Sequence, residues 1–262
     1  MSDIRLGVIA GKMKKMTVQK NISPLWKGPI LLDNLVTVPN CWVKLMTLPE
    51  LVLECFGHLI AKEVGLPFLE PIITKDPKNL LKGTRLAYYF ATADCSFCSL
   101  RQLISEIPTI EHAYLSVLQA WPEATLLAIL DELLANADRH HGNLLFDGHA
   151  KWIPIDYARA LGKPKAPWKG ERISSDYSAD NLLFNYLDCV DIKNAEKALK
   201  QIEAININEH LAIHFNGFPF PEGVDLSKFL ISWTFERRAK HLRSLVGKKR
   251  SKKNDINQKV LP

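Results

Sequence analysis

The chain has 262 residues, a hydrophobic content of 47% and a formal net charge of +6 at pH 7. So many apolar residues are enough to build a packed core, which excludes an intrinsically disordered protein. No run of about 18 consecutive apolar residues and no signal-peptide core is present, which predicts a cytoplasmic protein without a transmembrane segment.

Strands dominate the first part of the chain. Short apolar or alternating runs predict strands over 4–10, 28–38, 41–46, 66–74 and 84–91. One helix interrupts them over residues 48–65, where Pro49 lies near the start and Gly65 marks the end. Lys44 is the single charged residue within the apolar strand over 41–46.

From about residue 99 the pattern becomes helical. Apolar spacing near 3.6 predicts helices over 99–107, 111–121, 122–137, 178–190, 192–204, 208–215 and 226–246. Residues 143–146 and 151–156 predict a short β-hairpin with its turn at 147–150. We therefore expect an α+β fold of two lobes: a small sheet-rich lobe over 1–91 and a larger helical lobe over 92–247. A basic, flexible tail follows over 248–262.

Charged and polar residues gather in the segment ADRHHGNLLF, residues 137–146. Asp138 and Asn143 lie five positions apart, and Asp156 follows at the end of the predicted hairpin. Phosphoryl transfer needs a carboxylate that orients the attacking hydroxyl and oxygen ligands for Mg²⁺ on the nucleotide. These three residues have the composition for both tasks. Upstream, Lys44 on a strand and Glu54 on the next helix occur in the order of the ion pair that holds nucleotide phosphates in kinases.

The segments NADRHHGNLLF and WIPIDYARAL resemble the catalytic and metal-binding segments of HipA-like kinases and, more distantly, of phosphoinositide kinases. The similarity extends to WVKL, to LVLECFGHLIAKEVGLP and loosely to FLISWTFERRAKHL. It covers most of residues 5–246, but its specific part is about thirty residues long. The resemblance implies a two-lobed, protein-kinase-like fold that binds ATP with Mg²⁺.

The resemblance also implies a role for each matching residue. Asp138 would be the catalytic residue, Asn143 and Asp156 the Mg²⁺ ligands, and Lys44 with Glu54 the phosphate-binding pair. The implied reaction is transfer of the γ-phosphoryl group to a Ser or Thr hydroxyl of a protein substrate. Bacterial members of the family act as toxins or stress regulators, which implies an antitoxin-like regulator as a further partner.

The segment expected over the phosphates departs from the family. Residues 12–24, KMKKMTVQKNISP, contain no Gly-rich loop, so we expect Thr17 and nearby backbone amides to substitute for it. The family's full-length toxins also carry an extra N-terminal subdomain and are longer. Tyr88, Tyr89 and Phe90 are expected to touch the adenine, although core packing explains these three aromatic residues equally well.

Several alternatives stay open. A pseudokinase that binds a protein or nucleic acid would keep the fold without catalysis, and a kinase for lipids or small molecules would use the basic tail at a membrane surface. A zinc site at His140 and His141 is disfavoured, because adjacent imidazoles point in different directions and no third ligand has the right spacing. We expect His140, with Arg139, to orient the loop instead. The five cysteines suit reduced thiols, and Cys95 and Cys98 alone are a weak signal for metal or redox chemistry.

Overall fold

The computed structural model describes residues 4–16, 24–81, 87–107, 111–136, 138–162, 183, 192–204, 218–219 and 221–248. Its strands are β1 (Arg5–Ile9), β2 (Lys14–Met16), β3 (Leu25–Leu32), β4 (Thr37–Lys44), β5 (Ile72–Lys75), β6 (Tyr89–Ala93), β7 (Cys98–Ser99), β8 (Leu144–Phe146) and β9 (Trp152–Pro154). Its helices are α1 (Leu48–Glu63), α2 (Leu100–Glu106), α3 (Glu111–Ala120), α4 (Ala124–Leu133), η2 (His141–Asn143), η3 (Ala160–Gly162), α6 (Ile192–Glu203), α8 (Pro221–Ile231) and η5 (Ser232–Arg238). No helix within these residues is long and apolar enough to cross a membrane.

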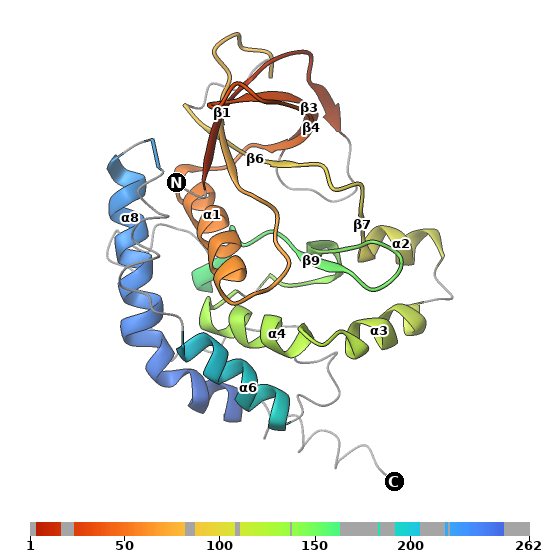
Figure 1. The fold of residues 1–262 in the computed structure, drawn as a ribbon, viewed down its shortest axis with the longest axis vertical. Coiled ribbons are helices and arrows are strands. Elements are labelled where there is room, and N and C mark those ends of the chain that lie inside the picture. The colour runs from red at the N-terminus through yellow and green to blue at the C-terminus, as the bar shows by residue number, and fades with distance from the viewer. Residues whose placement is uncertain are drawn as a thin grey trace.

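Five N-terminal strands close into a barrel, at the top of the molecule in Figure 1. The strand order is β1-β5-β6-β4-β3, and β1 also pairs with β3, which closes the sheet on itself. Neighbouring strands are antiparallel except for the parallel pair β1 and β5. β2 adds a sixth strand beside β3. Trp26, Ile30, Val43 and Tyr89 belong to the apolar cluster that packs the barrel strands together.

The predicted strand over 28–38 is wrong, because a turn divides it. β3 ends at Leu32, and β4 begins at Thr37. Between them the Asp33 carboxylate accepts a hydrogen bond from the backbone N–H of Asn34, whose side-chain oxygen accepts one from the N–H of Val36. Such short polar side chains stabilise turns by bonding to the backbone nearby. The short strands β2 and β7 were not predicted, because runs of three and two residues carry no periodic signal.

The helical part of the chain packs beneath the barrel together with a three-stranded sheet of order β7-β8-β9. The predicted hairpin is confirmed, since β8 pairs antiparallel with β9. The helices predicted over 99–107, 111–121, 122–137, 192–204 and 226–246 are confirmed by α2, α3, α4, α6 and by α8 with the helical residues that follow it. The helices predicted over 178–190, apart from Leu183, and over 208–215 lie outside the described residues.

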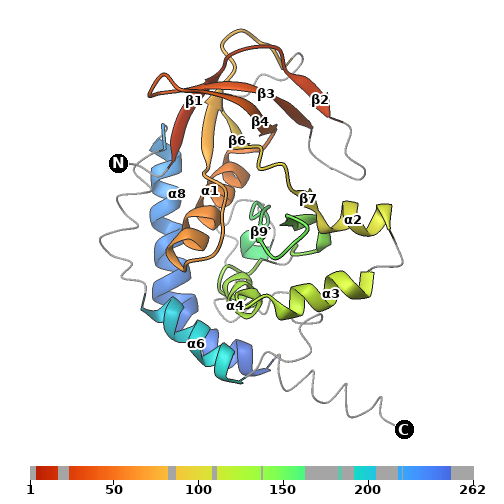
Figure 2. The ribbon, with the colours of Figure 1, turned by 45° about the vertical axis from the view of Figure 1, so that its right-hand side comes forward.

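Helix α1 joins the two parts of the molecule. It lies below the barrel, beside α8 and above α4, in both ribbon views (Figure 2). Thr47 and Glu50 form a capping box at its start, and every residue from Leu51 to Ala61 is buried. A Cβ atom on Gly57 would lie 2.1 Å from Cγ of Tyr157, so only glycine allows this approach. The close contact sets the distance between α1 and the segment that follows β9.

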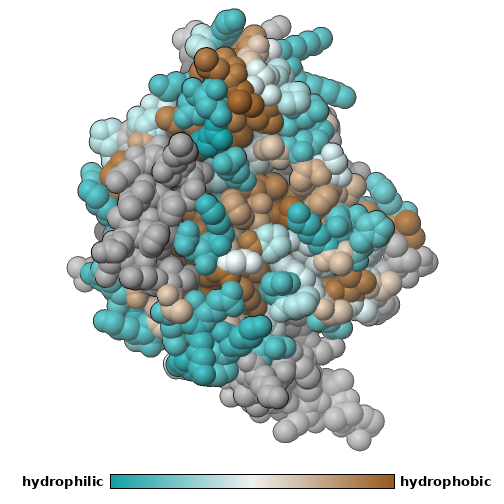
Figure 3. All heavy atoms as spheres, in the orientation of Figure 1, coloured by the Kyte–Doolittle hydropathy of each residue, from teal (hydrophilic) through white to brown (hydrophobic). Residues whose placement is uncertain are grey.

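The outer surface of the barrel is partly apolar, and brown residues gather over it in Figure 3. A shallow pocket of about 290 Å³ lies against β1 and the β3–β4 turn, with Leu6, Leu32 and Leu35 among its lining residues. Leu35 at the turn is 83% exposed. Tyr88, one of the three aromatic residues expected at the adenine, lines this pocket, but Lys44, Asp138, Asn143 and Asp156 do not, so the site has to be built from these four residues.

Candidate active site

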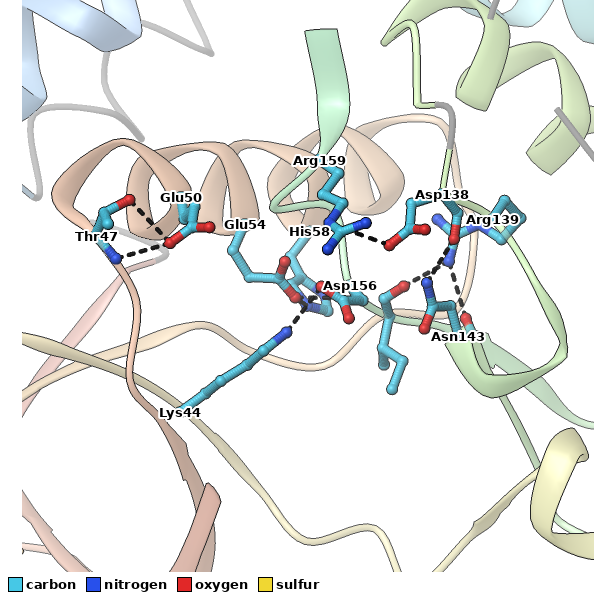
Figure 4. Close-up of polar contacts among 11 residues, drawn as sticks. Lys44, Thr47, Glu50, Glu54, His58, Asp138, Arg139, Asn143, Asp156 and Arg159 are labelled. Atoms are coloured by element: carbon cyan, nitrogen blue, oxygen red, sulfur yellow. Dashed lines mark hydrogen bonds and ion pairs between the residues drawn. The ribbon is translucent and has the colours of Figure 1, made fainter. Parts of the chain in front are cut away.

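An ion pair joins the barrel to the end of the hairpin. Nζ of Lys44, the last residue of β4, lies 2.8 Å from Oδ1 of Asp156, two residues beyond the end of β9. The two residues are 112 positions apart in the sequence. Their side chains are 24% and 29% exposed, so an incoming ligand can reach both (Figure 4).

Glu54 of α1 lies behind this ion pair. Its side chain is buried, its Oε1 accepts a hydrogen bond of 3.1 Å from the backbone N–H of Asp156, and Oε1 is also 3.4 Å from Nε2 of His58. Burial by itself raises the pKa of the Glu54 carboxyl, but the contact with His58 and the charge of Lys44 outweigh it and lower the pKa. Glu54 is therefore a buried negative charge that holds the backbone of Asp156.

The ammonium group of Lys44 is held in its charged form. Burial lowers its pKa, but the negative charges of Asp156 and Glu54 outweigh burial, and the net pKa is raised. The sequence predicted a direct pair between Lys44 and Glu54. In the structure the hydrogen bond of Lys44 goes to Asp156, while Glu54 bonds to the backbone of Asp156 and acts on Lys44 through its charge.

Asp156 has a left-handed backbone conformation, with a φ of 63°. Asp and Asn adopt this region more readily than most residues. The peptide unit that precedes Asp156 is held at both of its polar groups: Glu54 accepts from the N–H of Asp156, and Arg139 donates to the carbonyl of Ile155. A backbone held this firmly presents the Asp156 carboxylate in one direction.

Arg139 ties the loop before η2 to its surroundings. Its side chain is fully buried, and its Nε and Nη2 donate to the Asp131 carboxylate at 2.8 and 3.0 Å. Its Nη1 donates to the carbonyls of Asn143, at 2.8 Å, and Ile155. His140 supports the same loop, because its Nδ1 accepts from the N–H of Gly142 at 3.0 Å. The structural roles predicted for Arg139 and His140 are confirmed.

Asn143 and Asp138 lie on the loop that Arg139 holds. Nδ2 of Asn143 donates to the carbonyl oxygen of Asp138 at 2.7 Å, which leaves the amide oxygen for another partner. The Asp138 side chain is 29% exposed, and its Oδ2 lies 3.5 Å from Nε of Arg159. Figure 4 shows Asp138, Asn143 and Asp156 on neighbouring segments, with Lys44 approaching from the barrel. The structure thus brings these four predicted residues together.

The other predicted contacts lie elsewhere. Tyr89 is 1% exposed and belongs to the core of the barrel. Phe90 is buried and stacks on His58 with ring centroids 5.7 Å apart. The OH of Tyr88 donates to the carbonyl of Pro219. These three residues fit the core-packing explanation, and Thr17 lies outside the described residues.

Sequence reasoning missed an aromatic residue beside Lys44. Side chains alternate along a strand, so Trp42 shares the outward face of β4 with Lys44, while Cys41 and Val43 point into the barrel. Nε1 of Trp42 donates to Asp94 at 3.0 Å, and Nζ of Lys27 lies 5.0 Å from the Trp42 ring centroid. The alternation was available in the sequence as a signal for Trp42.

Two further residues of the site were missed. His58 contacts Glu54 because positions four apart share one face of a helix, a spacing that the sequence contains. Arg159, whose guanidinium lies beside Asp138, belongs to no local pattern. Only the folded chain shows that it faces the loop.

The site offers two oxygen ligands for a metal bound to a nucleotide. The described residues contain no cluster of three or more His, Cys, Asp or Glu side chains that could hold a metal by itself. Mg²⁺ on nucleotide phosphates needs only one or two protein ligands, because phosphates and water complete its shell. Oδ1 of Asn143 and Oδ2 of Asp156 have no hydrogen-bond partner among the described residues and fit that requirement.

No family model and no curated protein matches this chain. The function of the site is therefore inferred from the positions of its residues.

Proposed function

We propose that the protein is a Mg²⁺-dependent ATP phosphotransferase of the HipA-like type. The observation that carries the proposal is the convergence of Lys44 and Asp156 across 112 positions, with Asp138 and Asn143 on the adjoining loop. Kinase chemistry requires a phosphate-binding lysine, metal-binding oxygens and a carboxylate for the hydroxyl in one place. In this proposal the predicted smaller lobe, over 1–91, contains α1 and the barrel strands, of which β6 continues to Ala93, and the predicted larger lobe, over 92–247, contains the other helices.

Each residue has one task in the transfer. Lys44 exchanges its bond with Asp156 for bonds to the nucleotide phosphates. Asn143 and Asp156 hold Mg²⁺, which supplies charge neutralisation on the phosphates when bound. Asp138 orients the acceptor hydroxyl and accepts its proton. The buried bonds of Glu54 and Arg139 keep these groups in position, so little reorganisation is needed during the reaction.

Trp42 supplies an aromatic wall for the nucleotide base. It lies on the same face of β4 as Lys44, two residues away, and its bond to Asp94 fixes the indole edge. A ring held in this way offers a stacking surface with little loss of side-chain freedom on binding. This assignment replaces Tyr89 and Phe90, which are buried in the two hydrophobic clusters.

Nucleotide binding is tested first, by thermal unfolding with and without Mg²⁺–ATP. A ligand at about 100 times its Kd stabilises the folded state by about 2.7 kcal/mol, which raises Tm by several degrees. Asp156→Asn, which tolerates the same backbone conformation, should fold and lose the Mg²⁺-dependent rise. Glu196→Gln, an exposed carboxylate paired with Arg243, is the control and should keep it. No rise in the unaltered protein would favour the non-catalytic binding module.

The acceptor is tested by labelling with a γ-thiophosphate analogue of ATP. Bacterial cytoplasmic extract supplies protein acceptors, among them any antitoxin-like partner, and phosphoinositide vesicles supply lipid acceptors. We expect thiophosphate on Ser or Thr of a protein, lost in Asp138→Asn although this variant still binds Mg²⁺–ATP. Label on the vesicles alone would assign the site to a lipid kinase instead.

A further inference from the structure

Arg159 is a half-exposed cation at the centre of the site. Its Nε lies 3.5 Å from Oδ2 of Asp138, and its side chain is 40% exposed. No other hydrogen bond or ion pair connects its guanidinium to a described residue. Figure 4 shows the guanidinium between the loop of Asp138 and the segment that follows Asp156. Apart from this contact, the donor groups of Arg159 have no partner among the described residues, and its side chain is within reach of solvent.

The backbone that carries Arg159 is anchored on both sides. Tyr157, Ala158 and Ala160 are buried. The N–H of Ala160 donates to the carbonyl of Tyr157, and the N–H of Leu161 donates to the carbonyl of Leu134, both at 2.8 Å. Only the Arg159 side chain leaves this packed segment. The fold thus delivers a guanidinium to a fixed place and leaves its end free to change partners.

The contact with Asp138 is one that a ligand can replace. Exposed ion pairs contribute little because water and salt screen them, and the closest nitrogen and oxygen of this pair are 3.5 Å apart. Arg139 differs in every respect, since it is fully buried and bonds to Asp131 through two nitrogens. A phosphoryl group offers oxygens that match the donor geometry of a guanidinium.

We propose that Arg159 is a catalytic residue that binds the transferring phosphoryl group, an inference that rests on the function proposed above. In the step, the acceptor oxygen forms a bond to the γ-phosphorus as the bond to the β,γ-bridging oxygen breaks. ADP departs with that electron pair, and the hydroxyl proton passes to Asp138. Arg159 donates N–H groups to the non-bridging oxygens, where charge spreads in the transition state.

The resting ion pair also links the binding of the nucleotide to the release of the Asp138 carboxylate, which then accepts the proton of the acceptor hydroxyl. While Arg159 lies beside Asp138, its guanidinium faces Oδ2 of the carboxylate at 3.5 Å. When the guanidinium moves to the γ-phosphoryl group, that oxygen is freed to accept the proton of the acceptor hydroxyl. The same movement therefore stabilises the transition state and prepares Asp138.

The test compares a ground-state ligand with a mimic of the transferring group. Kd is measured for Mg²⁺–ADP alone and for Mg²⁺–ADP with aluminium fluoride, a planar substitute for the phosphoryl group. Arg159→Ala should keep the Kd of Mg²⁺–ADP within about twofold and weaken the aluminium fluoride complex by about 100-fold. Arg159→Lys should recover part of this loss, because the charge remains but the forked donors do not. Arg243→Ala, another half-exposed and ion-paired arginine, is the matched control and should change neither value.

The outcomes separate this inference from the proposal on which it rests. If the unaltered protein does not bind Mg²⁺–ADP, the proposed function fails and the role of Arg159 falls with it. If Mg²⁺–ADP binds and Arg159→Ala leaves the aluminium fluoride complex unchanged, Arg159 is only a partner of Asp138 and this inference alone is wrong. Equal weakening of both complexes would likewise contradict it, because it would show uniform binding of the nucleotide.

Discussion

Two arginines close to each other in the sequence, Arg139 and Arg159, show how differently the fold uses the same side chain. Arg139 is fully buried and bonds to a carboxylate and two carbonyls, whereas Arg159 is 40% exposed and has one long contact. The same division holds for other pairs. Arg238 is fully buried and pairs with Glu132, the residue that follows Asp131 in the chain. Lys44 and Asp156, by contrast, form a pair that solvent can reach.

The difference follows from solvation. Charges that are removed from water lose hydration, so a buried charge needs all its partners, and removal of one leaves the other uncompensated. An exposed pair loses little when it opens, because water replaces the partner. The buried pair of Arg139 and Asp131 therefore holds the loop of Asp138 and Asn143 in place. In the function that we propose, the exposed pairs exchange partners with a ligand. In this proposal, the ion pairs that hold the loop in position are different from the ion pairs that contact the ligand.

The largest expected effect comes from breaking the buried pair. Arg139→Met leaves the Asp131 carboxylate buried, with Asn136 as its one remaining side-chain partner among the described residues. It should lower the free energy of unfolding by about 3–5 kcal/mol. Urea denaturation measures the change. The double variant Asp131→Leu with Arg139→Met should recover much of the loss, because neither charge of the pair then remains buried. A cost below about 1 kcal/mol for Arg139→Met would contradict a supporting role.

The second prediction concerns the close contact between α1 and the segment that follows β9. Gly57→Ala places a methyl group 2.1 Å from Cγ of Tyr157, so the helix or the ring must move, at an expected cost of about 2 kcal/mol. Because Tyr157 follows Asp156, the variant should also weaken Mg²⁺–ATP binding. Gly247→Ala is the matched control, since nothing lies within 4 Å of its added methyl group. Similar stability of the two variants would mean that the approach of α1 is not tight.

Glu54→Gln removes the buried charge but keeps an oxygen for the N–H of Asp156. We expect a loss of about 1–3 kcal/mol at neutral pH, because Lys44 and His58 lose a charged partner. The pKa of Glu54 is lowered from its ordinary value of 4.5, so its contribution is fully present above pH 4.5 and is lost as the pH falls through the lowered pKa. The stability difference between the two proteins should therefore be constant from about pH 6 to 8 and shrink below 4.5. A difference that grows on acidification would contradict this assignment.

The smallest effect is expected for the exposed arginine. Arg159→Met should change the free energy of unfolding by less than about 1 kcal/mol, because its pair with Asp138 is screened by water. In about 1 M salt the remaining difference should disappear, since screening then acts within about 3 Å. Measured beside Arg139→Met, this variant tests the comparison directly. Equal destabilisation by the two substitutions would contradict the distinction between a buried arginine that stabilises the fold and an exposed arginine that does not.

Local signals made part of this structure predictable. The helix over 48–65 and the hairpin after Asn143 follow from periodicity and turn residues within a short window, and α1, β8 and β9 confirm them. The barrel was not predicted, because its closure depends on β1 pairing with both β3 and β5, which are far from it in the chain. The turn at Asp33 and Asn34 was predicted as part of a strand, since its apolar flanks masked the polar pair.

The sequence by itself determined which chemical groups are present and their order: Lys44, Glu54, Asp138, Asn143 and Asp156. Only the tertiary structure decided which of them meet, because Lys44 bonds to Asp156 and Glu54 holds the backbone of that residue. It also decided that Tyr89 faces the core of the barrel and that one arginine is buried while the other is exposed. The physical reason is burial. Neighbouring elements remove water from some charges and leave it on others, and no local pattern of residues encodes that choice.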